Sequence, residues 1–144
     1  MNTLTQEWLN AAQDDLLTME RILDDAHLTH IVAFHAEQAV EKCLKAMLED
    51  DGVEFPKTHD LSRLYKLLQE SRDFQIEQQD VLQTLNTLYI DSRYPGEFGL
   101  LPDGKPTLAE ARAFYDFAQT VYAYVQAVLE QPADRHEKNN DNER

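Results

Sequence analysis

The spacing of apolar residues along the chain predicts five helices and no strands. In five segments apolar side chains recur every three or four residues, which is the spacing of one helix face, and no segment alternates with the period of two typical of a strand. The predicted helices cover about residues 4–24, 29–49, 76–92 and 107–129, and a further helix begins at residue 59. The pattern therefore predicts an all-α fold, an up-and-down bundle of about five helices.

Polar residues at the ends of these segments predict where the helices begin and end. Residues 3–6 and 107–110 both match a capping box, in which two side chains satisfy free backbone N–H groups at a helix start. Gly52 follows the second helix and can adopt the left-handed conformation that ends a helix. The candidate caps for the helix after residue 58 are Thr58, His59 and Asp60.

The chain divides into a helical domain and a polar tail. Residues 95–106 contain three of the four glycines and three of the five prolines, so we expect one long irregular connection there. Connections of about 12 residues inside a compact domain are uncommon and often functional. The last segment is polar and has no aromatic residue, which predicts disorder. The expected domain covers residues 1–130 and the tail covers residues 131–144.

Composition narrows the classes of function. The 144 residues carry a formal net charge of -14, which argues against broad electrostatic capture of nucleic acid or of an anionic membrane. No apolar run approaches the roughly 20 residues that a membrane span requires, so we expect a cytoplasmic protein. The single cysteine, Cys43, excludes an internal disulfide and is expected to be buried and inert. Because the chain is this acidic, any contact with RNA must be local.

The second predicted helix has an apolar face and a chemically rich polar face. Gln38, Lys42 and Lys45 project into one arc of the helix together with His35 and Glu49. The interpretation without a binding role is that the two lysines form a solvated stripe held by local acids. Glu41 and Lys45 are the clearest pair at four-residue spacing.

Asp15 lies beside the apolar stripe of the first predicted helix. A carboxylate in that position needs a partner. We expect either a hydrogen bond to a basic residue of another helix or a position at the rim of the core.

Three further residues are candidates for phosphate chemistry. Arg93 directly follows the fourth predicted helix and precedes Tyr94, and an arginine fork can bind a phosphate bidentately or cap the helix. His59 at a helix start can act as a general base or as a simple cap.

The spacing of His27, His30 and His35 does not present three ligands on one face, so no metal site and no cofactor is expected.

Three fragments in this order resemble the HEPN domain family. They are Gln38-Ala39-Val40-Glu41-Lys42 with Leu44-Lys45-Ala46, then His59-Asp60-Leu61, and then Arg93-Tyr94-Pro95. The likeness covers roughly residues 5–130. It implies a homodimer with a polar cleft lined by Gln38, Lys42, Lys45, His59, Arg93 and Tyr94, and RNA or nucleotide phosphate as the ligand. It also implies a minimal nucleotidyltransferase as partner in a toxin-antitoxin-like pair, with Tyr94 as a conceivable target of modification.

The resemblance departs from the family pattern at one point. Many HEPN proteins are metal-independent ribonucleases whose fingerprint is an arginine, four to six residues, and then a histidine. Arg93 matches the arginine, but positions 98, 99 and 100 are Phe98, Gly99 and Leu100. We therefore favour a nucleotide-binding and partner-binding module. The alternatives are an endoribonuclease that uses Arg93 with an unconventional base such as His59, and a purely structural oligomerisation module, which a salt-bridged and closed polar arc would favour.

Overall fold

The computed structural model describes residues 1–92 and 104–131, and within the fourth helix it describes side chains as far as Tyr89. Five α-helices and one short 3₁₀ helix make up the described part, which contains no strand. This confirms the predicted all-α fold. The helices are α1 (Thr3–Ile22), η1 (Ala26–Leu28), α2 (Thr29–Asp50), α3 (Leu61–Ser71), α4 (Gln79–Ser92) and α5 (Leu108–Leu129).

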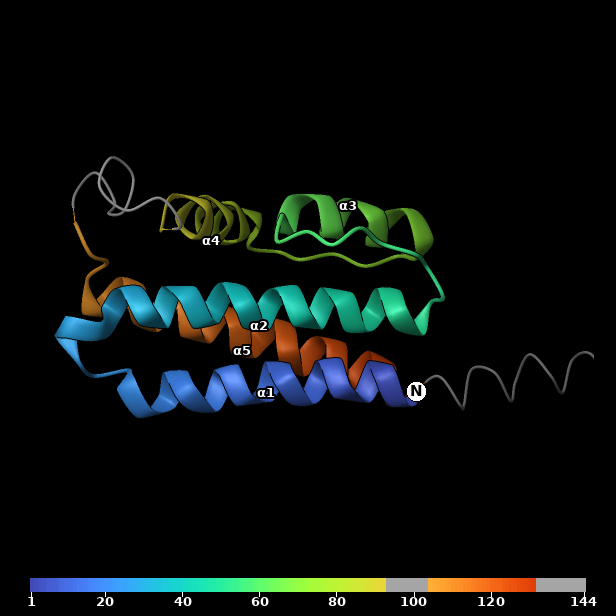
Figure 1. Cartoon of the computed structure of the whole chain (residues 1–144), viewed down its shortest axis with the longest axis horizontal. Helices are drawn as coiled ribbons and strands as arrows, with labels where there is room; N and C mark the ends of the chain where they lie inside the picture. Colours follow the sequence, from blue (N-terminus) through green and yellow to red (C-terminus); the bar gives the residue numbers. More distant parts are fainter. Residues whose placement is uncertain (93–103, 132–144) are drawn as a thin grey trace, which may run out of the picture.

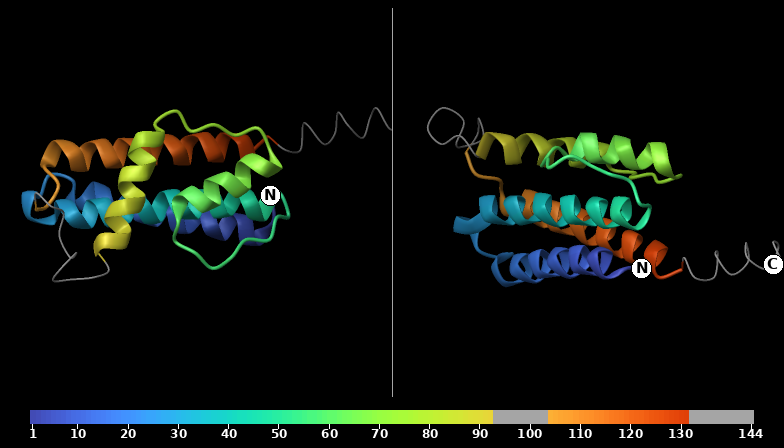
Figure 2. Two further views of the ribbon diagram at one scale, coloured as in Figure 1. Left: turned by 90° about the horizontal axis from the view of Figure 1, so that it is seen from above. Right: turned by 45° about the vertical axis from the view of Figure 1, so that its right-hand side comes forward.

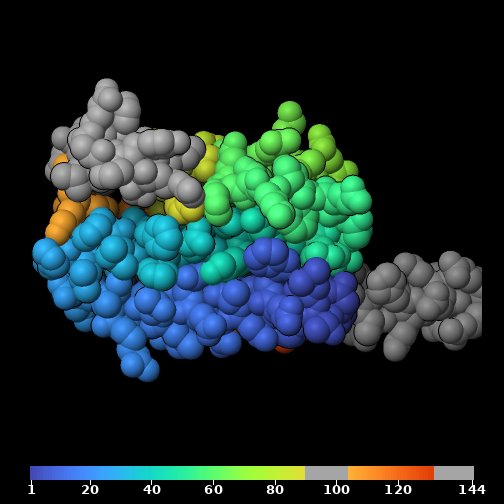
Figure 3. All heavy atoms as spheres, in the orientation of Figure 1, coloured from blue at the N-terminus to red at the C-terminus, as the bar shows by residue number. Residues whose placement is uncertain are grey.

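The long helix α2 is the centre of the arrangement. It runs beside α1 and α5, while α3 and α4 cover its side opposite α1 (Figure 1). The left view of Figure 2 shows that α4 crosses the direction of the long helices instead of running along it. In Figure 3, α1 and α2 lie side by side on one face, with the segment that leads into α3 above α2. Since α2 contacts all four other helices, its side chains can join groups from every part of the bundle.

The core is built from the apolar stripes that the sequence predicts. On α1, Ala12 and Met19 are fully buried, and on α2 the whole apolar arc from Val32 to Leu48 is excluded from water. Removing this apolar surface from water is the main force that holds the helices together. Cys43 belongs to this core, as predicted, and burial raises the pKa of its thiol.

The predicted helix starts are partly right. The Thr107–Glu110 capping box at the start of α5 is confirmed, with both reciprocal hydrogen bonds present. The capping box predicted for residues 3–6 is wrong, because the Asn2 side chain instead caps α1 by accepting from the Thr5 N–H at 2.8 Å. Gly52 has φ +69°, which confirms the left-handed conformation expected after α2.

The starts of α3 and α4 lie two to three residues later than predicted. Asp60 is the cap of α3, so His59 lies just outside the helix. Before α4, the Ile76 N–H donates to the Tyr65 hydroxyl at 2.9 Å, and this contact keeps the chain extended instead of helical. On α4, the Asn86 side chain accepts from the Leu61 N–H at 3.0 Å and thereby ties the start of α3 to α4.

Among the described residues, no helix is both long enough and apolar enough to cross a membrane. The predicted tail and most of the predicted long connection lie outside the described residues.

Candidate functional site

A group of ionisable side chains on and around α2 forms the candidate site. We call it the α2 cluster, and its members are Asp15, His35, Glu37, Glu41, Lys42, Lys45 and His59. They come from α1, from α2 and from the segment that precedes α3.

The first half of the α2 cluster is centred on Asp15 of α1. Its carboxylate accepts from Lys42 Nζ at 2.7 Å and lies 2.8 Å from His35 Nδ1. Because a carboxylate oxygen only accepts, His35 Nδ1 donates to it. Asp15 is buried, whereas about a quarter of the His35 and Lys42 side chains is exposed. Of the two outcomes expected for Asp15, the structure shows the hydrogen bond to a basic residue of another helix.

The second half is centred on Glu41 of α2. One carboxylate oxygen accepts from Lys45 Nζ at 2.9 Å, which confirms the predicted pair at four-residue spacing. The other oxygen lies 2.9 Å from His59 Nδ1, which joins α2 to the segment before α3. The side chains of Glu41 and Lys45 are only 4% and 9% exposed, so the solvated stripe expected for the lysines is wrong for Lys45. Lys45 also lies over the Trp8 ring, with Nζ 5.3 Å from its centroid.

Glu37 of α2 is a third carboxyl group of the cluster, and it lies close to Glu41 and Lys45. It is fully buried and accepts from Gln38 Nε2 at 2.8 Å, while its other oxygen, Oε2, has no hydrogen-bond partner among the described residues. Burial, and then the charge of Glu41, raise the pKa of Glu37 to about 9. At neutral pH this group is therefore a neutral carboxylic acid, so it adds no charge to the cluster.

A row of aromatic rings connects the two histidines of the cluster. The His35 ring packs edge-on against Phe34, with centroids 5.3 Å apart. Phe34 stacks on Tyr89 of α4 at 5.6 Å, and Tyr89 packs against His59 at 5.2 Å. His35 and His59 thus lie at the two ends of one continuous set of contacts.

Of the six residues expected to line a cleft, Lys45 and His59 share the Glu41 carboxylate, whereas Lys42 pairs with Asp15. Lys42, Lys45 and His59 belong to the α2 cluster, and Gln38 contacts it through Glu37. The remaining two, Arg93 and Tyr94, lie outside the described residues. The nearest described side chain in sequence, Tyr89, contacts His59.

The polar arc of α2 is salt-bridged but only partly closed. Lys45 is closed off by Glu41, whereas 51% of the His59 side chain is exposed. Glu41 occupies Nδ1 of His59, so the second ring nitrogen, Nε2, remains for another partner. An anchored imidazole of this kind can donate to an anion when protonated and can accept a proton when neutral. Ion pairs that served only to stabilise the fold would not require the exposed His59 ring.

Sequence reasoning missed Glu37 and Glu41 as buried groups and Phe34 and Tyr89 as neighbours of the histidines. One signal existed for the two acids, because they continue the three-four spacing of the fully buried Leu44 and Leu48. A second signal existed for Phe34, which projects into the same arc of α2 as Gln38 and Lys45 and is therefore an aromatic residue on the polar face.

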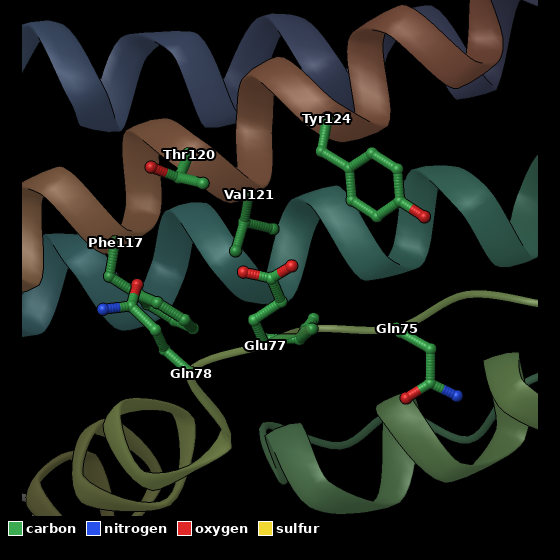
Figure 4. A pocket seen from close by; sticks show the side chains of 8 residues that line it. Gln75, Glu77, Gln78, Phe117, Thr120, Val121 and Tyr124 are labelled. Carbon is green, nitrogen blue, oxygen red and sulfur yellow. The ribbon is translucent and has the colours of Figure 1, made fainter.

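A separate groove lies between α5 and the segment that leads into α4 (Figure 4). Its volume is about 510 Å³, and it shares no residue with the α2 cluster. Its lining is formed by Gln75, Ile76, Glu77, Gln78, Phe117, Thr120, Val121 and Tyr124.

The other histidines of the first half of the chain lie apart from the cluster. His27 is exposed, and its backbone carbonyl accepts from Lys105 Nζ at 2.9 Å. Burial, followed by the charge of Lys105, lowers the pKa of His30. Among the side chains that the structure describes, no group of three or more His, Cys, Asp or Glu is placed to hold a metal ion.

The fold defines the class of protein, which is an all-helical domain. Its candidate site combines buried ion pairs with the more exposed rings of His59 and Phe34. The family model described as HEPN domain matches residues 5–128. Since the match covers most of the chain, this protein belongs to the HEPN domain family. Membership of this family places the protein among nucleotide- and RNA-related modules in general. Searches of curated proteins and of solved structures found no significant match.

Proposed function

We propose that this HEPN domain binds a phosphate group of RNA or of a nucleotide at the α2 cluster and acts as a partner-binding module. The observation that carries the proposal is the half-exposed His59 ring, which the buried Glu41 carboxylate holds by Nδ1. A pre-oriented imidazole needs no reorganisation to meet an anion, because its second nitrogen already faces away from its anchor.

The local balance of charge supports an anionic ligand despite the net charge of -14. Glu37 is neutral, so two carboxylates face two lysines and two histidines in the cluster. Protonation of either histidine gives the cluster as a whole a net positive charge. Lys42 and His35, each about a quarter exposed, are close enough to the surface to add to it. The proposed contact with the anion is confined to the α2 cluster, because the acidic net charge of the chain disfavours a broad contact with nucleic acid.

Replacing His59 with alanine is expected to weaken RNA binding at least about tenfold, because one charge-assisted hydrogen bond to phosphate is lost. Affinity for a short single-stranded RNA at fixed salt, measured by isothermal titration calorimetry, tests this expectation. His27→Ala is the matched control, since His27 is an exposed histidine outside the cluster. Equal affinities of His59→Ala and the wild type would overturn the proposed site.

The proposal includes the partners that the family resemblance implies. These are a second copy of the chain and a minimal nucleotidyltransferase in a toxin-antitoxin-like pair, for which Tyr94 is the candidate modification target. The support is membership of the HEPN family. Sedimentation of the purified chain tests the dimer. Co-purification, together with inspection of the neighbouring reading frame for a Gly-Ser followed by an Asp-x-Asp pattern, tests the transferase.

A second candidate function is metal-independent cleavage of RNA. The specific observation in its favour is the Glu41–His59 pair, because a carboxylate that holds Nδ1 leaves Nε2 as the proton-accepting atom of a neutral imidazole. Arg93 would steady the phosphate charge.

If this second candidate is correct, purified protein cuts structured or single-stranded RNA in the presence of a chelator, and both Arg93→Ala and His59→Ala abolish the cuts. Gel analysis of labelled RNA gives the result. Intact RNA together with measurable binding would reject the nuclease and retain the binding module.

A further inference from the structure

Phe34 is an exposed aromatic side chain in the middle of a polar surface. It is 39% exposed, whereas Val40, Leu44, Met47 and Leu48 of the same helix are buried. It projects from the same arc of α2 as Gln38 and Lys45. Neither the apolar core nor the ion pairs explain an aromatic residue at this position.

The neighbours of Phe34 fix the orientation of its ring. Tyr89, itself only 6% exposed, stacks on one face with an angle of 24° between the rings. His35 packs edge-on at 88°. Although Tyr89 stacks on the Phe34 ring and His35 packs against it, 39% of Phe34 stays exposed and can meet a ligand. A ring held in this way loses little conformational freedom when a flat ligand stacks on it.

The position of Phe34 relative to the histidines points to the kind of flat ligand. Tyr89 alone separates Phe34 from His59, and His35 touches Phe34 directly. An aromatic platform that alternates with cationic or proton-donating groups is the usual arrangement for single-stranded nucleic acid, in which bases stack while phosphates meet the charges.

We propose that Phe34, backed by Tyr89 and flanked by His35 and His59, is a stacking subsite for an unpaired nucleobase. This inference rests on the proposed phosphate site and adds that the ligand is single-stranded RNA that is recognised through a base as well as through its backbone. Stacking tolerates any base, so the subsite confers preference for single strands over duplex and little sequence preference.

The test compares two probes on the full chain: hexauridylate, and an abasic ribose-phosphate hexamer of the same length. Wild type is expected to bind hexauridylate at least about fivefold more tightly than the abasic hexamer, since base stacking on one aromatic ring contributes about that factor or more. Phe34→Leu keeps the volume roughly and removes the aromatic face. It is expected to abolish the difference and leave the abasic affinity unchanged.

The control is Tyr124→Leu, because Tyr124 has a similar exposure of 40% but lines the separate groove on α5. It is expected to bind both probes as the wild type does. Equal wild-type affinities for the two probes would overturn the stacking subsite and leave the phosphate site standing, and this comparison does not depend on the folding of any variant. Failure of the wild type to bind either probe would overturn both the stacking subsite and RNA as the ligand of the phosphate site.

Discussion

Replacing Glu41 with alanine is expected to lower the free energy of unfolding by about 3–5 kcal/mol. Glu41 accepts from Lys45 at 2.9 Å, and both side chains are almost completely buried. Without the carboxylate, the lysine ammonium stays in the interior with no compensating charge. The loss is measured by urea denaturation of wild type and variant at neutral pH.

Two further variants show whether an unpaired charge causes the loss. The double replacement Glu41→Leu with Lys45→Met removes both charges and is expected to recover most of the lost stability. Asp24→Ala breaks an exposed ion pair with Arg112 and is expected to change stability by less than about 1 kcal/mol. A Glu41→Ala variant as stable as Asp24→Ala would show that Lys45 reaches water without its partner.

Replacing Glu37 with glutamine is expected to stabilise the protein at neutral pH by about 3 kcal/mol. Burial raises the pKa of Glu37 to about 9 in the fold, whereas its ordinary value, expected in the unfolded chain, is 4.5. As the pH rises above 4.5, the unfolded chain releases this proton first, so the stability contributed by the group is complete below pH 4.5 and is lost progressively up to about pH 9. Glutamine stays neutral and avoids this loss.

The measurement is the difference in unfolding free energy between Glu37→Gln and wild type, taken from pH 4.5 to 9. The difference is expected to be small at pH 4.5 and to grow with pH. Glu7→Gln, the same change at an exposed position on α1, is the control for the substitution itself. A difference between Glu37→Gln and wild type that is flat across this range would show that Glu37 is ionised in the fold.

The helices could be predicted from the sequence because their signals are local. The capping box at Thr107 and the three-four spacing of α5 lie within one segment, and the structure confirms both. The prediction at residues 3–6 failed because a better cap, Asn2, stood next to it, and propensity does not rank two adjacent caps reliably.

The candidate site could be predicted only in part. Lys42, Lys45 and His59 were singled out as one group, and the structure pairs Lys42 with Asp15, and Lys45 and His59 with Glu41. The lysines lie on one helix, so periodicity relates them. The acids between them were harder to interpret, because a glutamate on an apolar stripe normally indicates the edge of that stripe.

What the sequence by itself determined is the set of helices, most of their ends and the family, since these depend on residues that are close along the chain. What only the tertiary structure decided is the site. The contacts from Asp15 to His35 and from Glu41 to His59 join residues about 20 positions apart, and the Phe34–Tyr89 stack joins residues still farther apart. Their geometry depends on how α1, α3 and α4 pack on α2, and no helical period encodes that packing.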